Sequence, residues 1–261
     1  MPFSKPGAAG RAGGNPPCAE SGTAAAIYSS TTGARPSDAP RPSQGRGGAR
    51  NRAGRLSHAL ALEQARAVMA AAQAARLIGL PFNRHVTIHW AAAGVADGEA
   101  ASAGGRFLAL VRDWLRKRQA ATSWAWVREN GDGKGSHVHI LIHVPLSVSW
   151  DAWRLRRWLV RVSGSPYRSG VIRTQRIGGR ANAASAAPEV YEANLAAVVA
   201  YLVKGTSRDA AEALGLERQE AGGPIIGKRA GWSENVGRAA RARLTGPGGI
   251  PNLGDGRGAE R

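Results

Sequence analysis

The sequence is poor in cysteine, in acidic residues and in long apolar runs, and each shortage excludes a class of protein. A single cysteine, Cys18, among 261 residues excludes an internal disulfide and a zinc site built from several thiolates. No stretch of about 18 apolar residues is present, which excludes a transmembrane helix. The first residues contain no apolar signal-peptide core. We therefore expect a cytoplasmic protein with no membrane partner.

Acidic residues are only half as frequent as basic ones. The chain has 36 Lys and Arg against 18 Asp and Glu, which gives a formal net charge of +18. Such an excess favours an anionic partner, and nucleic acid before a membrane surface.

The composition changes along the chain and predicts four segments. Residues 1–56 are rich in Pro and Gly and poor in large apolar residues, which predicts a disordered basic tail. Residues 57–205 carry the periodic patterns of one folded domain. Residues 206–245 predict a basic helical extension, and the Gly-rich residues 246–261 predict a second disordered tail.

The folded segment alternates between strand and helix patterns. We expect a helix from an N-cap at Ser57 to about Gly79, a strand at 85–90, and a helix at 106–119 after a loop at 94–103. Strands at 123–129 and 136–144 flank a Gly-rich turn, a helix capped by Ser149 spans 149–162, and a strand spans 170–177. A last helix, at 188–204, begins with Pro188.

This βαββαβ order predicts an α+β fold of the split β-α-β type. We expect a four- to five-stranded antiparallel sheet with helices on one face and the last helix, which carries a tyrosine, at the other.

The third predicted strand has two chemically different faces. Alternate side chains of a strand share a face, so His137 and His139 point one way while Val138 points the other. The Val138 face continues with Ile140, Ile142 and Val144, and is expected to pack under the helices. Two imidazoles at i and i+2, with Cα atoms roughly 7 Å apart, can converge on one cation.

Glu129 precedes the turn and is the candidate third ligand. If the turn has an odd number of residues, Glu129 lies opposite His137 on the same face, whereas an even number places Ser136 there. Two imidazoles and one carboxylate suit a divalent metal that also holds a phosphate oxygen. His85 and His89, on the first strand, are expected to be structural or to border the site, and His143 to flank it.

The last helix carries two tyrosines with different surroundings. Its apolar stripe contains Leu195, Val199 and Leu202, and Tyr191 lies on that stripe, so we expect Tyr191 to pack in the core. Tyr201 lies off the stripe, with Lys204 one turn later. A phenol has a pKa of about 10, and a neighbouring cation favours the phenolate that can attack phosphorus.

These residues resemble the motifs of the HUH endonucleases, a family named for its His-hydrophobe-His strand. The resemblance covers about residues 82–205 and rests on the strand at 85–89, on His137 and His139, and on a Tyr-x-x-Lys motif at 201–204. It implies Mg²⁺ or Mn²⁺ held by His137, His139 and Glu129. It also implies Tyr201 as the nucleophile, with Lys204 assisting.

A single Tyr-x-x-Lys is similar to the replication initiators of plasmids and filamentous-type phages. The resemblance implies sequence-specific nicking and joining of single-stranded DNA at a replication origin, through a 5′-phosphotyrosine, which initiates rolling-circle replication. The sequence has no helicase P-loop, so a separate helicase is implied. A mobilisation relaxase or a transposase uses the same chemistry. A non-catalytic nucleic-acid-binding module is the alternative from another class, but it should expose aromatic side chains on its central strands, whereas parity places Trp124 and Trp126 under the helices.

The C-terminal extension contains a second group of candidate DNA-binding residues. Basic side chains on and near its helix could hold the DNA backbone, and the adjacent tryptophan could stack on a base. The alternative, a surface helix that covers the edge of the sheet, stays open. The candidates are Arg229, Trp232, Arg238 and Arg241.

Overall fold

The computed structural model describes residues 54–245. The expected tail at 246–261, and all but the last three residues of the expected tail at 1–56, lie outside the described residues, as does Cys18. Within the described part, no helix combines the length and the apolar character needed to cross a membrane.

A five-stranded antiparallel sheet organises the fold, in the order β5-β2-β4-β3-β7. Four of its strands were expected, and they have the order of a split β-α-β sheet, which confirms the α+β prediction. The fifth, β7, comes from the C-terminal extension and pairs with β3 at one edge. The strands are β2 (Arg84–His89), β3 (Trp124–Gly131), β4 (Gly135–Ile142), β5 (Ile172–Arg176) and β7 (Ala230–Trp232).

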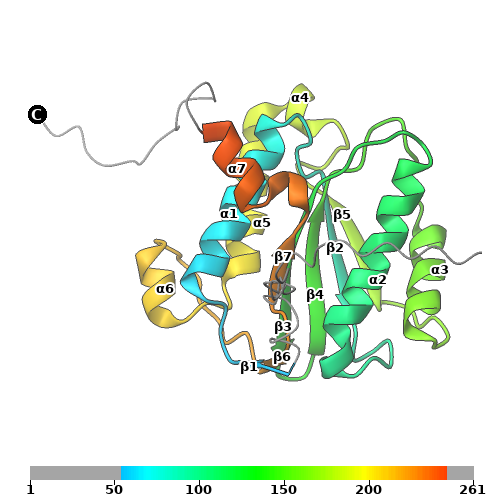
Figure 1. Ribbon diagram of the computed structural model, residues 1–261, viewed down its shortest axis with the longest axis vertical. Coiled ribbons are helices and arrows are strands. Elements are labelled where there is room, and N and C mark those ends of the chain that lie inside the picture. Colours follow the sequence, from blue (N-terminus) through cyan, green and yellow to red (C-terminus); the bar gives the residue numbers. More distant parts are fainter. Residues whose placement is uncertain (1–53, 246–261) are drawn as a thin grey trace, which may run out of the picture. The chain divides into compact units, whose positions relative to one another are not determined.

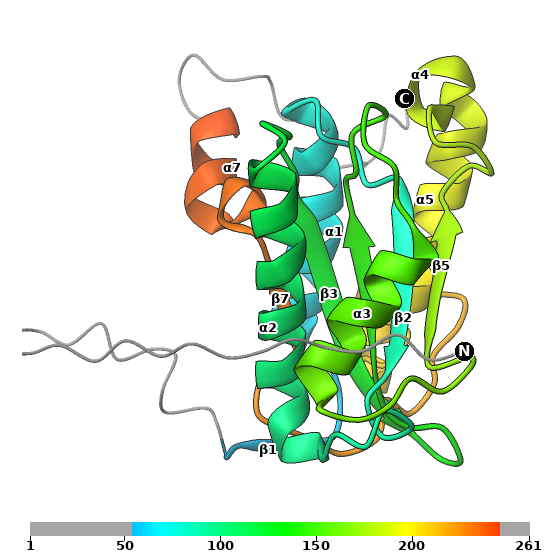
Figure 2. The same ribbon diagram turned by 90° about the vertical axis from the view of Figure 1, so that its right-hand side faces the viewer.

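Helices α2 (Asp97–Arg116) and α3 (Ala152–Ser163) cover one face of the sheet (Figures 1 and 2). The core on this side joins Val138, Ile140 and Ile142 of β4 to the apolar sides of the two helices. Trp124 and Trp126 pack against the same core, as strand parity predicted.

Helices α1 (Leu62–Leu77) and α5 (Pro188–Val203) lie at the other face (Figure 1). Leu141 of β4 and Val127 of β3 bury their side chains against these helices. Tyr191 of α5 belongs to this core, is 1% exposed, and donates a hydrogen bond from its hydroxyl to the Phe82 carbonyl at 3.0 Å. The prediction that Tyr191 packs in the core is therefore confirmed.

Three expected helix starts are wrong. Helix α1 begins at Leu62 after Ala61, whose N–H donates to Gln64 Oε1, whereas Ser57 lies in the short strand β1 (Leu56–Ser57). Helix α3 begins after Asp151, and Ser149 instead donates its hydroxyl hydrogen to Asp151 Oδ1 at 2.6 Å.

Helix α2 begins at Asp97, inside the stretch expected to be a loop. Its small residues reflect close packing: Ala100 and Ala103 are fully buried, and a Cβ at Gly104 would lie 3.9 Å from the Trp90 ring. Asp97 also pairs with buried Arg128 of β3 at 2.6 Å. Helix α2 is thereby anchored to the sheet at its first residue, where a carboxylate also complements the helix dipole.

The remaining elements are short segments outside the four expected strands and the long helices. Strand β6 (Ile225–Ile226) pairs with β1, and β7 is followed by a 3₁₀ turn, η2 (Glu234–Val236), and α7 (Arg238–Thr245). The others are the short helices α4 (Ala183–Ala186) and α6 (Arg208–Ala213). The expected C-terminal helical extension thus contributes a strand to the sheet as well as a helix.

The two tyrosines of α5 should differ in their effect on stability. Tyr191→Phe removes the donor to a buried carbonyl and should lower the free energy of unfolding by about 1–3 kcal/mol. Tyr201→Phe should change it by less than about 0.5 kcal/mol, because the Tyr201 hydroxyl bonds to no described residue. Urea denaturation of the two variants measures the difference, and equal losses would contradict the distinct placements.

Candidate functional site

The β3–β4 hairpin decides which side chain of β3 faces the histidines. Its turn has three residues, 132–134, closed by the pair Gly131 and Gly135. Gly133 and Gly135 have positive φ angles of 73° and 64°, which favour glycine. The odd-numbered turn places Glu129 directly opposite His137, so the register on which the third ligand depended is confirmed.

Glu129, His137 and His139 form a buried cluster of three metal-ligating side chains. Their ligand atoms all lie within 4.8 Å of one another, and the residues are 4%, 4% and 3% exposed. Glu129 Oε2 lies 3.4 Å from His137 Nε2 and 3.9 Å from His139 Nε2. The spacing suits convergence on one ion.

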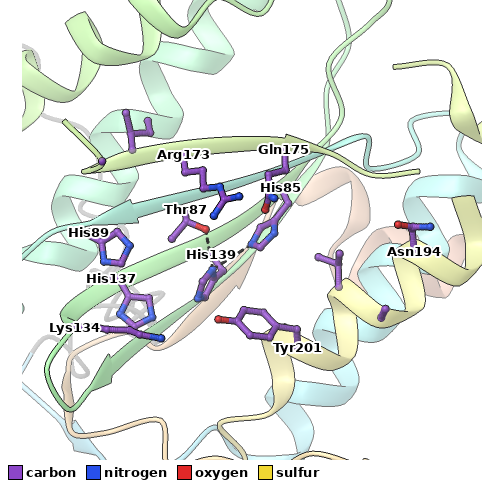
Figure 3. A pocket seen from close by; sticks show the side chains of 14 residues that line it. His85, Thr87, His89, Lys134, His137, His139, Arg173, Gln175, Asn194 and Tyr201 are labelled. Atoms are coloured by element: carbon purple, nitrogen blue, oxygen red, sulfur yellow. Dashed lines mark hydrogen bonds between the residues drawn. The ribbon is translucent and has the colours of Figure 1, made fainter. Parts of the chain in front are cut away.

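The Nδ1 atom of each imidazole makes a hydrogen-bonding contact on the side of the ring away from Glu129. His137 Nδ1 lies 2.8 Å from the Gly135 carbonyl oxygen. His139 Nδ1 lies 3.1 Å from Thr87 Oγ1 and 3.2 Å from His85 Nε2 (dashed lines in Figure 3). With the proton on Nδ1, each ring turns the lone pair of Nε2 toward Glu129. Metal-binding histidines are typically oriented by such a second hydrogen bond.

Two atoms of the cluster are buried with no hydrogen-bond partner among the described residues. They are His139 Nε2 and Glu129 Oε1. A buried polar atom without a partner costs about 1–3 kcal/mol, and more when it is charged. A divalent cation between the two imidazoles and the carboxylate would give His139 Nε2 a partner, and the donor set of two imidazoles and a carboxylate is one that such cations accept. The residues therefore fit a divalent metal site.

Burial and neighbouring charges set the protonation of the cluster. Burial lowers the pKa of His139 well below its ordinary value, and the positive charges around it add to the effect. Burial alone would raise the pKa of Glu129, but its contacts with His137 and with Lys204 outweigh burial and hold that pKa below its ordinary value. A neutral imidazole and an ionised carboxylate are the forms that bind a metal.

Lys204 contacts both Glu129 and Tyr201. It is buried, its Nζ donates to Glu129 Oε2 at 2.6 Å, and Glu220 Oε2 lies 3.5 Å away. The same Nζ lies 4.7 Å from the centroid of the Tyr201 ring. Lys204 therefore lies beside Tyr201, as expected, but the shortest contact of Lys204 is with the Glu129 carboxylate.

Tyr201 projects from α5 toward the histidines (Figure 3). Its ring centroid lies 5.2 Å from that of His139 and 6.4 Å from that of His85. The ring borders a cavity of about 760 Å³ between α5 and the sheet. The structure thus brings the expected nucleophile to the expected metal ligands. The cavity is lined by His85, Thr87, His89, Lys134, His137, His139, Gly170, Ile172, Arg173, Gln175, Asn194, Ala197, Val198 and Tyr201.

The sequence prediction underrated the first strand. Thr87 pairs with His139 and His89 with His137, so β2 contributes a second polar row to the same face. The His89 and His137 rings are stacked, with centroids 5.3 Å apart. The i, i+2 spacing of His85, Thr87 and His89 was a usable signal, because it matches that of the β4 histidines.

Two further residues of the site come from the edge strand. Arg173 and Gln175 of β5 pair with Thr87 and His85 and line the cavity. Nothing in the sequence alone aligns β5 with β2, because the two strands are joined by non-local pairing.

The C-terminal candidates lie away from this cavity. Arg229 is 2% exposed and donates to Ser57 Oγ at 3.0 Å and to the Gly222 carbonyl at 3.3 Å, so its expected contact with DNA is wrong: the side chain has no access to a ligand. Arg241 donates to the Val236 carbonyl at 2.9 Å and lies 5.7 Å over the ring of half-buried Trp232.

Arg238 is the one exposed residue of that candidate group. It belongs to α7, beside the β7 edge, whereas the cavity opens along β5 at the opposite edge. The structure agrees with the alternative that this segment covers the edge of the sheet.

Comparison of the chain with protein-family models, with curated proteins and with solved structures finds no match in any of the three. The function must therefore be inferred from the chemistry of the site itself.

The metal site can be tested by direct binding. We expect the full chain to bind Mn²⁺ in calorimetry, and Glu129→Gln or His139→Ala to weaken binding at least about tenfold, because each removes a ligand. His143→Gln is the matched control, since His143 Nδ1 bonds the Pro81 carbonyl at 2.8 Å and stands outside the cluster. Unchanged affinity in both ligand variants would exclude this site.

The buried histidines should make stability depend on pH. Burial, followed by the charge of Arg173, lowers the pKa of His85 from 6.5 to about 4. Between these values the unfolded chain binds more protons than the folded one, so the free energy of unfolding falls as the pH falls, by up to about 3 kcal/mol. Urea denaturation at pH 7 and pH 4.5 should show a smaller loss for His85→Asn than for the unaltered protein. An equal loss of stability in the two proteins would show that His85 does not cause this pH dependence.

Proposed function

We propose that the protein is a metal-dependent endonuclease and strand transferase that acts on single-stranded DNA, with Tyr201 as its nucleophile. One observation carries the proposal: the Tyr201 ring lies 5.2 Å from the His139 ring, beside a buried Glu-His-His cluster in which His139 Nε2 has no hydrogen-bond partner among the described residues. A phenol next to a metal site is an arrangement for attack on a phosphodiester.

The architecture supports an enzyme of the HUH type. The His-x-His strand is at the centre of an antiparallel sheet, Glu129 faces it from the neighbouring strand, and the tyrosine comes from a helix on the same face. The one Tyr-x-x-Lys motif then favours replication initiation of the rolling-circle kind, at an origin opened by a separate helicase. A relaxase or a transposase would use the same residues.

The chemical step balances as a transesterification. When held by His137, His139 and Glu129, a divalent ion such as Mg²⁺ or Mn²⁺ would supply positive charge to a phosphate oxygen. The Tyr201 oxygen forms a bond to phosphorus while the bond from phosphorus to the 3′ oxygen breaks. That oxygen leaves with the electron pair and takes up a proton as a free 3′-hydroxyl, and the phenolic proton leaves to solvent. Tyr201 keeps the 5′-phosphate, so a later attack by a 3′-hydroxyl rejoins the strand.

Lys204 supports this step in two ways. Its ammonium group lies 4.7 Å from the Tyr201 ring centroid, where its positive charge would offset the negative charge that develops at the phosphate during attack. Its hydrogen bond to Glu129 fixes the end of α5 against the hairpin that carries the histidines. The lysine is a positioning residue as well as a source of charge.

The cavity favours a single strand as substrate. Lys134 and Arg173 provide positive charge at its wall, and Gln175 and Asn194 provide amide groups. The histidine cluster is 3–4% exposed, and a flexible single strand can bring one phosphate to it more easily than a stiff duplex can. A non-catalytic binding module is disfavoured, because Trp124 and Trp126 pack against the α2 and α3 core and not on the open face.

Trapping of the covalent adduct tests the proposal. The protein is incubated with Mn²⁺ and a library of single-stranded oligonucleotides labelled at either end, then separated under denaturing conditions. A label at the 3′ end should stay with the protein, and a label at the 5′ end should be released with a free 3′-hydroxyl. Tyr201→Phe should abolish the adduct, and the matched control Tyr191→Phe should retain it at a temperature where it is folded.

Two results would overturn the proposal. One is an adduct that persists in Tyr201→Phe. The other is the lack of any adduct across the library from protein that binds Mn²⁺ normally.

A further inference from the structure

The outer face of α3 carries three exposed arginines. At ~100° per residue, the buried residues Leu155, Leu159 and Val162 fall on one side of the helix. The opposite side collects five exposed residues at i, i+3, i+4, i+7 and i+8 spacing: Trp153, Arg156, Arg157, Val160 and Arg161. We call these five residues the α3 outer face.

Aromatic rings hold two of its guanidinium groups in place. The Arg157 guanidinium carbon lies 4.7 Å from the centroid of the Trp153 ring, and that of Arg156 lies 5.0 Å from the centroid of the Tyr167 ring. A stacked guanidinium keeps its N–H groups in a fixed plane, which reduces the entropy lost when it binds a phosphate. Trp153 itself is 59% exposed.

The exposed positions of α3 include no acidic residue. The nearest carboxylate in sequence, Asp151, accepts from Ser149 at 2.6 Å and lies 3.5 Å from Arg154, whose guanidinium packs over Trp114 and takes no part in the outer face. Arg106 of α2 adds a further positive charge beside α3, since it donates to the Val162 carbonyl at 3.3 Å. The charge of the α3 outer face is therefore not neutralised by α3 itself.

We infer that the α3 outer face is a second nucleic-acid site, which binds the phosphate backbone of double-stranded DNA. Duplex DNA carries one negative charge per roughly 1.7 Å of its axis, so a basic helix face laid against it meets several phosphates. The choice of a duplex rests on the proposed function, because an enzyme that nicks one strand at an origin must act beside unopened duplex. A membrane fits less well, since Trp153 and Val160 are flanked by arginines and form no continuous apolar face.

The position of α3 relative to the cavity suits a site that holds duplex DNA while a separated strand reaches Tyr201. Helices α2 and α3 lie on one side of the sheet and α5 with Tyr201 on the other (Figure 1). Edge strand β5 separates the two sides: Thr174 accepts a hydrogen bond from Trp150 on the α3 side, whereas Arg173 and Gln175 line the cavity. A strand leaving a duplex held on α3 reaches Tyr201 by passing over β5.

Salt-dependent binding tests the inference. The full chain carrying Tyr201→Phe is titrated into a blunt fluorescent duplex in EDTA, at several salt concentrations, so that neither metal nor cleavage contributes. Adding Arg156→Gln, Arg157→Gln and Arg161→Gln together should weaken binding at least about tenfold at low salt. It should also reduce the slope of log K against log salt by about 2.7, because each phosphate that an arginine neutralises contributes about 0.9 to that slope.

The matched control removes the same charge elsewhere. Arg66, Arg180 and Arg208 are exposed and lie outside α3, and their replacement by Gln should leave both the affinity and the slope nearly unchanged. Equal weakening by the two triple variants would show that only net charge matters and would overturn the inference. So would loss of binding to phosphatidylserine vesicles in the α3 variant with duplex binding intact.

Failure of the α3 inference can be distinguished from failure of the proposed function. In an otherwise unaltered chain, the α3 triple variant should still form the Tyr201 adduct on short single-stranded oligonucleotides, which need no duplex contact. A single Arg161→Gln variant, with an expected slope change of about 0.9, repeats the binding test should the triple variant fold poorly. The inference fails alone when adducts form and duplex binding is unaffected by α3. The proposed function fails alone when duplex binding depends on α3 and no adduct forms.

Discussion

The buried ion pair between Lys204 and Glu129 is the contact on which the geometry of the site depends. The two side chains are each 5% exposed and meet at 2.6 Å. They join the end of helix α5 to strand β3, whose partner strand carries both histidines. Removing one member of such a pair leaves a charge buried without compensation, at a cost of about 3–5 kcal/mol. The ion pair thus fixes the distance between the tyrosine helix and the histidine strand.

The same carboxylate contacts both the lysine and the histidines through one oxygen. Oε2 accepts from Lys204 at 2.6 Å and lies 3.4 Å from His137 Nε2 and 3.9 Å from His139 Nε2, whereas Oε1 has no hydrogen-bond partner among the described residues. A divalent ion bound there would add two positive charges beside a lysine. A phosphate oxygen in the cavity would then offset that excess, so metal and anionic substrate should favour one another's binding.

Local rules were enough to choose the chemistry-bearing residues. Strand parity separated His137 and His139 from the apolar Val138, and the helical stripe separated Tyr201 from Tyr191. Both rules depend only on backbone period, which tertiary contacts do not change. The strand order followed from the same periodicity, because a βαββαβ pattern has few ways to pair.

The sequence predictions are wrong mainly where contacts with residues far away in the sequence determine the local structure. The sequence predicts a surface position for Arg229 because Arg is seldom buried, yet Ser57, which is remote in sequence, and the nearby carbonyls of Gly222 and Gly223 satisfy its guanidinium. Ser57 resembles an N-cap, but pairing with β6 extends the chain there. The small residues after Gly94 resemble a loop, but they allow α2 to approach Trp90. Likewise, the contribution of β2 and β5 to the cavity required a register that no single segment encodes.

The three-residue turn at 132–134 has a consequence for how this chain can diverge. Side chains on a strand alternate, so one inserted or deleted residue in the turn would exchange the two faces of β3 opposite the histidines. Arg128 or Asn130 would then replace the carboxylate, and the apolar helices would meet Glu129. Length changes by two residues keep the parity. Lineages that retain the site should therefore vary the length of this turn in even steps only, although the turn is exposed and would otherwise tolerate any length.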